Sequence, residues 1–303
     1  MLSSGGDFLL PMVDARDAAG ALAKFAGEPV RLLRRLSLPV GSVREPVGET
    51  QVLVVVDTET TGLNPAADSI IELALRRVRI DAMGDIVEIG RGQNWLEDPG
   101  RPLALDIARL TGLTDSELQG AAIDDGVATG IIASADWICA HNSGFDRRFV
   151  EQRLPGAAGG RWCCSCVDVD WAARGFDGRG LGWLLSQVGL CHGGHRALND
   201  VDATIAILAS ESDGRTAISE MVGNAASPAW LVTAVGASFA TKDVLRTRGY
   251  RWNAAIRCWQ REVPDRERQT EEFWLARTVY CDDANPQAFG PRIEAVDPAT
   301  RFL

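Results

Sequence analysis

An unbroken run of five apolar residues, Val52 to Val56, leads directly into the polar sequence D-T-E-T-T-G. A run of this kind, rich in Val, predicts a central strand that is buried on both faces. Side chains two positions apart on a strand point the same way, so Asp57 and Glu59 are expected on one face. Two carboxylates at the end of a buried strand are unfavourable unless a cation neutralises them, and oxygen ligands suit Mg²⁺ or Mn²⁺. The stretch therefore predicts a metal-dependent phosphoryl-transfer enzyme.

The pattern that follows predicts a mixed sheet. From Ser69 to Ile80 apolar and polar residues alternate, which indicates a half-exposed strand. The sequence D-A-M-G-D then predicts a hairpin turn into a returning strand over residues 86–89. Glu72 is interpreted as a polar position of the alternating strand and not as a member of a site.

Helical patterns and a further short strand alternate after the hairpin. Residues 106–118 predict helix, turn and helix, and Thr114 with Glu117 forms a capping box. An apolar strand over residues 135–140 precedes H-N-S-G-F-D, where another helix is expected to begin. Asp146 in its first turn has two interpretations: an acid that favours the helix dipole in any protein, or a metal carboxylate beside the first strand.

A last helix with the same kind of entry is predicted further along the chain. Apolar residues at helical spacing run from Val201 to Leu208. Asp200 opens this helix, and His195 precedes it in the entry loop. A histidine in such a place is most often an ordinary surface residue, but the chain has three histidines and this one stands five residues before an acid.

Taken together, these motifs resemble those of the DEDD family of exonucleases. The resemblance rests on D-T-E-T-T-G with Asp57 and Glu59, H-N-S-G-F-D with Asp146, and H-R-A-L-N-D with His195 and Asp200. The last motif is similar to that of the histidine branch, DEDDh, which includes the proofreading epsilon subunit of bacterial DNA polymerase III and ribonuclease T. The order and apolar flanks agree from about Val52 to Ser210, roughly half of the chain.

The resemblance implies a ribonuclease H-like α/β fold, with helices flanking a mixed sheet, and a 3′→5′ exonuclease that releases nucleoside 5′-monophosphates. It implies two divalent cations, Mg²⁺ or Mn²⁺, with Asp57 bridging both, Glu59 and Asp200 completing one site, and Asp146 holding the other through water. His195 would accept a proton from the attacking water, because an imidazole titrates near neutral pH. It further implies that the substrate-binding residues are Thr60, Thr61, Gly62, Leu63, His141 and Asn142.

Composition narrows the setting of this chemistry. The net charge of −10 argues against a chain that grips nucleic acid with its whole surface, although a local basic track is compatible with it. No run of about 18 apolar residues and no signal peptide is seen, which predicts a protein without a membrane partner. Seven cysteines without regular spacing indicate reduced thiols and a cytoplasmic location. Cys163, Cys166, Cys191 and His192 could bind zinc, but buried small apolar side chains are the favoured interpretation for the cysteines.

The C-terminal part changes in character. From Thr241 to Arg261 the chain has six bases and one acid, interleaved with aromatic residues, in a predicted small α+β module. Bases that follow phosphates and aromatics that stack on bases are typical of single-strand binding, while tryptophans of the module core are the alternative. The candidate nucleic-acid contacts are Lys242, Arg246, Arg248, Tyr250, Arg251, Trp252, Arg257 and Trp259.

The expected organisation has five parts, and the function has competing interpretations. The parts are an N-terminal extension (1–50) with one or two short helices over 14–38, an exonuclease domain (51–210), a linker (211–228), the module (229–282) and a loose tail (283–303). The leading function is removal of nucleotides from 3′-terminal or single-stranded DNA in proofreading or repair, with a DNA polymerase or another replication or repair protein as partner. An RNA-trimming 3′→5′ exoribonuclease and a non-catalytic, polymerase-associated adaptor remain alternatives.

Overall fold

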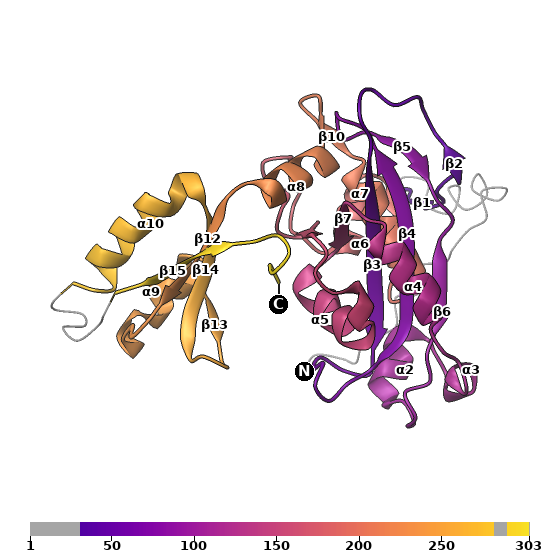
Figure 1. Cartoon of the computed structure of the whole chain (residues 1–303), viewed down its shortest axis with the longest axis horizontal. Coiled ribbons are helices and arrows are strands. Elements are labelled where there is room, and N and C mark those ends of the chain that lie inside the picture. Colours follow the sequence, from indigo (N-terminus) through magenta and orange to yellow (C-terminus); the bar gives the residue numbers. More distant parts are fainter. Residues whose placement is uncertain (1–30, 282–289, 303) are drawn as a thin grey trace, which may run out of the picture.

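The computed structural model describes residues 31–281 and 290–302. A seven-stranded mixed sheet with helices on both faces makes up the larger part, and a four-stranded antiparallel sheet with helices packed against it makes up the smaller part (Figure 1). Within the described ranges, none of the helices has the length and apolar character needed to cross a membrane.

The large sheet is mixed and flanked by helices, as the sequence predicts. Its strands are β2 (Gly41–Ser42), β3 (Gln51–Thr60), β4 (Ile70–Ile80), β5 (Ile86–Ile89), β6 (Gln93–Leu96), β7 (Trp137–Ala140) and β8 (Trp162–Cys164). The order is β2-β5-β4-β3-β7-β8, with β6 also paired to β4. Strand β4 is antiparallel to both of its neighbours β3 and β5, whereas β3, β7 and β8 are parallel. The predicted fold class is therefore confirmed.

Strand β3 divides two hydrophobic cores, as its apolar run predicts. Val54 and Val56 point into one core, and Leu53 and Val55 point into the other. The helices that cover the first core are α4 (Asp125–Ala133) and α5 (Ser143–Arg153), and those over the second are α6 (Leu181–Gln187), α7 (Ala197–Leu208) and α8 (Ala217–Ala226). Because both faces of β3 are covered, the direction in which its last residues point is fixed by the whole sheet.

Strand β4 matches the predicted half-exposed strand only in its second half, where Arg77 and Arg79 are exposed. Two other polar positions are covered, because α7 packs across the strand. Arg76 is 6% exposed and forms an ion pair with Asp202 of α7, and Glu72 is 1% exposed. At these two positions alternation marks polar residues that are paired under a helix.

The positions of the short helices agree with the predictions made from the helix end at Gly112 and from the capping box. Helices α2 (Leu105–Thr111) and α3 (Asp115–Leu118) lie within the predicted helix-turn-helix, and α2 ends at Gly112, which has φ 71°. The predicted capping box of Thr114 and Glu117 is present at the start of α3. A 3₁₀ turn, η2 (Pro155–Ala157), follows α5.

The N-terminal region is partly outside the described residues. The predicted helices over residues 14–38 and the extension 1–50 fall there up to residue 30. In the described part, β1 (Arg34–Arg35) pairs in parallel with β9 (Leu190–Cys191), so the helix prediction is wrong over residues 34–35. Strand β2 pairs with β5 and extends the large sheet.

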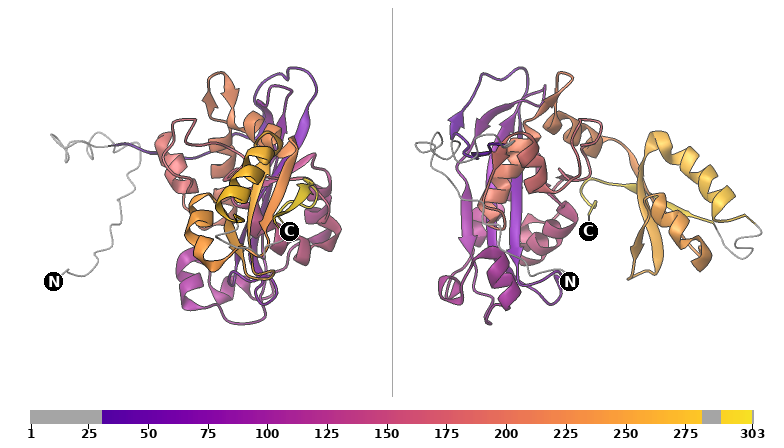
Figure 2. Two further views of the ribbon diagram at one scale, coloured as in Figure 1. Left: turned by 90° about the vertical axis from the view of Figure 1, so that its left-hand side faces the viewer. Right: turned by 180° about the vertical axis from the view of Figure 1, so that it is seen from behind.

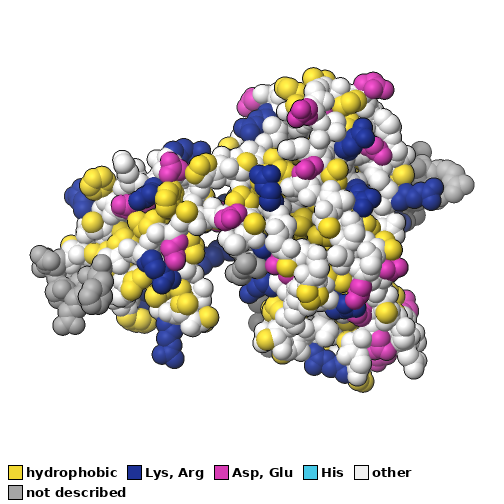
Figure 3. Space-filling model, in the orientation of Figure 1, with side chains coloured by type: hydrophobic (Ala, Val, Ile, Leu, Met, Phe, Trp, Pro, Cys, Tyr) yellow, Lys and Arg dark blue, Asp and Glu magenta, His cyan; other side chains and the backbone are white. Residues whose placement is uncertain are grey.

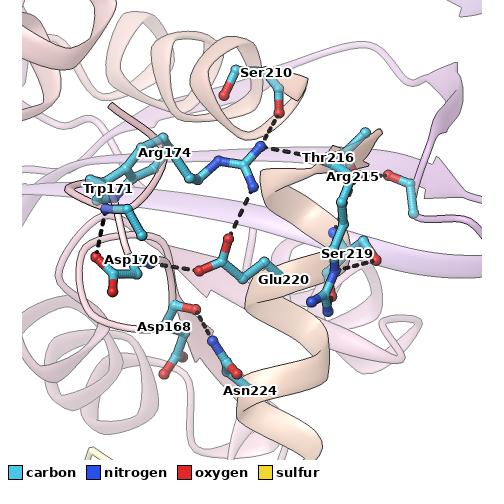
Figure 4. A network of polar contacts seen from close by, with 12 residues as sticks. Asp168, Asp170, Trp171, Arg174, Ser210, Arg215, Thr216, Ser219, Glu220 and Asn224 are labelled. Carbon is cyan, nitrogen blue, oxygen red and sulfur yellow. Dashed lines mark hydrogen bonds and ion pairs between the residues drawn. The ribbon is translucent and has the colours of Figure 1, made fainter. Parts of the chain in front are cut away.

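The predicted linker is wrong, because most of it is structure that packs on the exonuclease core. A small hairpin, β10 (Glu211–Ser212) with β11 (Arg215–Thr216), leads into α8, whose apolar side chains join the core. Figure 4 shows how polar contacts hold α8 in place. Arg174 donates to Glu220 (3.0 Å) and to the carbonyl of Ser210 (2.7 Å), and Asn224 donates to the carbonyl of Asp168 (2.9 Å).

The smaller sheet includes part of the predicted tail. Its elements are β12 (Ala229–Ala234), η3 (Phe239–Thr241), α9 (Lys242–Thr247), β13 (Arg251–Asn253), β14 (Cys258–Pro264), α10 (Asp265–Thr278) and β15 (Arg292–Val296). The sheet order is β13-β14-β12-β15, and β15 pairs with β12 over five residues. The prediction of a loose tail is therefore wrong for residues 292–296.

The chain after β15 returns to the larger part and ties the two parts together (Figure 2). Arg301 pairs with Asp168 of the larger part (2.5 Å) and with Glu262 of β14 (2.6 Å). Arg147 of α5 donates to the carbonyls of Ala299 and Arg301. Arg301 is 9% exposed and Asp168 only 2%, so this is a largely buried bridge.

Replacing Arg301 by Ala should therefore destabilise the chain strongly. Asp168 would be left buried without its cation, which typically costs about 3–5 kcal/mol. Urea denaturation followed by tryptophan fluorescence measures this, with Arg292→Ala as control. Arg292 pairs with Glu294, and both are more than half exposed, so the control should lose at most about 1 kcal/mol. Equal losses in the two variants would contradict the bridging role of Arg301.

Candidate active site

Three of the predicted metal carboxylates converge at one end of the large sheet. Asp57 and Glu59 occupy the last residues of β3, and Asp200 lies in the first turn of α7. Ligand oxygens from the three side chains all lie within 4.8 Å of one another. The fold explains this meeting, because α7 packs directly on β3 and β4. An all-oxygen, anionic set of this size fits a hard divalent cation.

Asp146 lies behind this group and is held by the backbone of β3. Its Oδ1 accepts hydrogen bonds from the Thr58 amide (3.0 Å) and the Thr58 hydroxyl (2.8 Å). Asp146 is only 4% exposed, and its charge acts on Asp57. Thr58 points to the opposite face of the strand from Asp57, as the alternation predicts. The side chain of Asp146 is thus oriented by the same strand that carries the acids.

Burial, together with the clustering of the acids, raises the pKa values of Asp57, Glu59 and Asp146. Burial is the largest cause for Asp57, whose pKa lies well above its ordinary value, and the charges of Asp146 and Asp200 raise it further. Burial and then the charge of Asp200 raise the pKa of Glu59 to about 8. Burial raises the pKa of Asp146 to about 7, although hydrogen bonds from Thr58 oppose the shift. A bound cation would relieve this repulsion.

Glu72 is a member of the site that the sequence interpretation missed. It stands opposite Glu59 in the β3–β4 register and accepts hydrogen bonds from Asn94 (2.8 Å), from Arg196 (3.1 Å) and from the Ala197 amide (3.2 Å). These contacts hold the start of α7 against β4, immediately before Asp200. The signal that could have found it is its pairing with Glu59, but strand register cannot be read from the alternation alone.

His195 does not lie against the carboxylates in this structure. It is exposed, it has φ 61°, and within the described ranges no hydrogen bond holds its side chain. A positive φ is unfavourable for a residue with a Cβ, and such strain is typical of functional loops. His192 is the histidine that contacts the site, with Nε2 2.9 Å from Oδ1 of Asp200. The sequence interpretation considered His192 only as a zinc ligand.

The predicted substrate-binding residues divide into two groups. Thr60 donates to the carbonyl of Gly62 (2.6 Å), Thr61 donates to Asp68 (3.1 Å), and Leu63 projects outward with 83% exposure. His141 and Asn142 lie at the end of β7, beside the start of α5.

The side chain of His141 is already engaged. Its Nδ1 lies 2.8 Å from the Ser165 hydroxyl, and its Nε2 lies 2.7 Å from the carbonyl of Arg179. Burial lowers the pKa of His141. These contacts give His141 a structural role, in addition to any contact with substrate.

The cysteines and the module residues complete the list of predicted sites. Cys163 is buried in the core on β8, and no trio that includes a cysteine lies close enough for a metal among the residues described. In the module, Tyr250 is 2% exposed and donates to Glu271 (3.0 Å), so its prediction as a nucleic-acid contact is wrong. Arg248 is likewise held by Glu271, at 3.0 Å. The remaining candidates are Lys242, Arg246, Arg251, Trp252, Arg257 and Trp259.

Comparison with known proteins places this site in a family. The chain is 38% identical over 107 residues to the PolC-type DNA polymerase III of Bacillus subtilis (strain 168), which is 34% of this chain and 7% of that protein. It is 33% identical over 162 residues to the PolC-type enzyme of Streptococcus pyogenes serotype M5, covering 50% of this chain and 10% of that protein. The chain thus spans only about a tenth or less of the length of these relatives.

Solved structures resemble the chain more distantly. One is exonuclease X in complex with 5′ overhanging duplex DNA, at 23% identity and a TM-score of 0.42, over 57% of this chain and 99% of that one. Another is Escherichia coli exonuclease I in complex with a dA16 oligonucleotide, at 15% identity and a TM-score of 0.45, over 71% of this chain and 63% of that one.

The sequence model of the family described as Exonuclease (RNase_T) matches residues 54–208. This match spans about half of the chain, from β3 to the end of α7, and it contains every carboxylate of the candidate active site. The chain therefore belongs to this family of exonucleases.

Proposed function

We propose that the protein is a 3′→5′ exonuclease that hydrolyses DNA from its 3′ end and releases nucleoside 5′-monophosphates. The observation that carries this proposal is the convergence of Asp57, Glu59 and Asp200 within 4.8 Å, inside a region that matches an exonuclease family. A group of carboxylates with raised pKa values has no structural benefit of its own, and a cation-dependent reaction gives it a purpose.

The carboxylates are proposed to hold two divalent cations, Mg²⁺ or Mn²⁺. Asp57 is central to the set and would contact both, with Glu59 and Asp200 on one side and Asp146 on the other. Bound cations supply positive charge that stabilises the attacking and leaving oxygens of an in-line displacement. The protein contributes the fixed positions of the carboxylates, through the buried strand β3 and the ion pair of Glu72 with Arg196.

His195 is proposed to take the proton of the attacking water. Its present exposure requires residues 193–196 to turn inward when a 3′ end binds. Two glycines, Gly193 and Gly194, precede it and allow such a change of backbone conformation. His192 would remain on Asp200 and keep that carboxylate oriented.

The terminal nucleotide would lie along the loop after β3. The backbone from Thr60 to Leu63 is the proposed contact, and the exposed Leu63 side chain offers an apolar surface for a base. Similarity to relatives named as DNA polymerase III supports DNA, and not RNA, as the substrate proposed for this chain. It also supports the proposed role in proofreading or repair beside a polymerase. An exoribonuclease would use the same carboxylates.

Replacing Asp57 by Asn should abolish most of the cleavage without unfolding the protein. We expect the rate on a 5′-labelled oligodeoxynucleotide with Mn²⁺ to fall at least about a hundredfold, because the carboxylate that would hold both cations is lost. The metal-free melting temperature should stay level or rise, since one repelling carboxylate is gone. Asp136→Asn is the control, because Asp136 accepts from the Val52 amide at the opposite end of β3. Wild-type turnover in Asp57→Asn would reject the assignment.

The two histidines can be separated by mutation. His195→Ala should lower the single-turnover rate about a hundredfold or more and leave Mn²⁺ affinity unchanged, as expected for a general base. His192→Ala should instead weaken Mn²⁺ binding, because Asp200 loses its partner. If His192→Ala loses more of the metal-saturated rate than His195→Ala, the base is not His195.

Stability should depend on pH in the direction set by the raised pKa values. Free carboxyl groups titrate near pH 4, whereas Asp146 and Glu59 titrate at about 7 and about 8 in the folded protein. The folded state therefore binds more protons between these values, and stability in EDTA should fall as pH rises from about 4 to about 8.

Thermal melts of wild type and Glu59→Gln across this range measure the effect. Glu59→Gln should show a shallower decline, and Mn²⁺ should raise the melting temperature of wild type more at pH 8 than at pH 5. An equal Mn²⁺ shift at both pH values would contradict a site built from these acids.

A further inference from the structure

The module carries an exposed surface of alternating cations and aromatic rings, which we call the aromatic–basic face. Its five members are Phe239, Lys242, Arg246, Trp252 and Trp259. The Lys242 ammonium lies 4.2 Å from the centre of the Phe239 ring. The Arg246 guanidinium lies 5.9 Å from the Trp259 ring, and Trp259 meets Trp252 edge-on at 5.6 Å. Lys242 and Arg246 are one turn apart on α9, so the five side chains form one row.

Much of this row is not part of the module core. Phe239 is 80% exposed and Trp252 is 52% exposed. The core of the module consists of other residues, such as Val232, Leu245 and Leu275. Two large aromatic rings that are exposed to water do not contribute to the stability of the fold. Exposed apolar patches of this type mark interaction sites.

The basic residues of the module fall into two classes. Arg248 and Arg261 are neutralised by the buried Glu271, and Arg268 pairs with Glu272. In contrast, no acidic partner is found for Lys242, Arg251 or Arg257 in the described part of the chain.

Arg246 of the aromatic–basic face has only a weak acidic partner. It meets Asp243 at 3.5 Å, with both side chains about 70% exposed. A pair of this kind is strongly screened by water and is easily exchanged for a phosphate. Among the described residues, the two cations of the aromatic–basic face thus have either no acidic partner or one that a phosphate can replace.

We infer that this face binds single-stranded nucleic acid, with bases stacked on Phe239 and Trp252 and phosphates beside Lys242 and Arg246. Stacking platforms that alternate with cations are what single-strand binding without sequence preference requires. An acidic protein partner would account for the cations, but it would leave two exposed ring faces unexplained.

The β13–β14 hairpin points in the same direction as the end of β3 that lies beside α2 and α3, and α9 lies on the side of the module away from the large sheet (Figures 1 and 2). Figure 3 shows hydrophobic and basic side chains intermixed over the module. This inference rests on the proposed function for its choice of partner, and it makes the module the part that holds the strand being shortened.

Fluorescence anisotropy of the full chain in EDTA tests binding without cleavage. The probes are 5′-fluorescein oligodeoxythymidylate and oligouridylate of about 20 nucleotides. Phe239→Ala/Trp252→Ala should weaken binding at least about fivefold per ring. Lys242→Gln/Arg246→Gln should reduce the slope of log affinity against log salt by about 1.4. The controls are Phe273→Ala and Arg277→Gln on α10, where Phe273 is 71% exposed; they should change neither quantity.

A rescue variant and the salt dependence distinguish loss of stacking from a folding defect. Trp252→Phe should restore most of the lost affinity, which would separate stacking from a folding defect. Affinity and salt slope equal to wild type in both double variants would overturn the inference and leave the face as a protein-docking surface. Comparing the two probes shows whether DNA or RNA is the preferred strand.

Hydrolysis of the p-nitrophenyl ester of thymidine 5′-monophosphate with Mn²⁺ separates this inference from the proposed function. The ester is too small to reach the module, so the double variants should hydrolyse it at the wild-type rate. No ester or oligonucleotide hydrolysis by wild type, together with intact face-dependent binding, would reject the nuclease proposal and leave the binding face standing. Loss of ester hydrolysis in the double variants would overturn the assignment of a separate binding face.

Discussion

Repulsion between carboxylates at the end of β3 is the constraint on which this structure depends. Left to themselves, Asp57, Glu59 and Asp200 would separate or become protonated. Burial and this repulsion raise the pKa values of Asp57 and Glu59, which records that tendency. The protein holds them with contacts to neutral or basic partners. Thr58 donates twice to Asp146, and His192 contacts Asp200. Together with the burial of β3 on both faces, these contacts keep a geometry that is useful only when cations bind.

Glu72 is a further buried acid whose charge is compensated by neighbouring donors. One more buried acid would be expected to worsen the repulsion, and its charge does raise the pKa values of Asp57 and Glu59. Its three donors, Asn94, Arg196 and the Ala197 amide, explain why it is tolerated. The ion pair with Arg196 fastens the start of α7 to β4 and thereby positions Asp200. Repulsion among the carboxylates lowers the stability of the folded state, and the contacts of Glu72 beside them raise it again.

The sequence predicted those parts of the fold that depend on local signals. The apolar run before Asp57, the Gly112 helix end and the capping box at Thr114 need only neighbouring residues. The ordered motifs likewise led to the carboxylates that the structure brings together. Pairings between distant segments were missed, because nothing near residues 292–296 indicates that they join β12. The position of His195 was missed for a related reason: a motif records the residue but not the conformation of its loop.

The two parts of the chain address one electrostatic difficulty in different ways. A net charge of −10 repels a polyanion, so an enzyme acting on one needs local positive charge at the catalytic site and along the path of the strand. Cations between the carboxylates would provide the first. The module provides a candidate for the second, because Glu271 takes up Arg248 and Arg261 inside while Lys242 and Arg246 remain outside. The Arg301 bridge then matters beyond stability, since it links the module that carries the basic surface to the part that carries the carboxylates. A nucleic-acid strand that is bound both at the carboxylates and at the module would lose conformational entropy once, when it binds. Successive hydrolysis steps would then proceed without a new loss of that entropy.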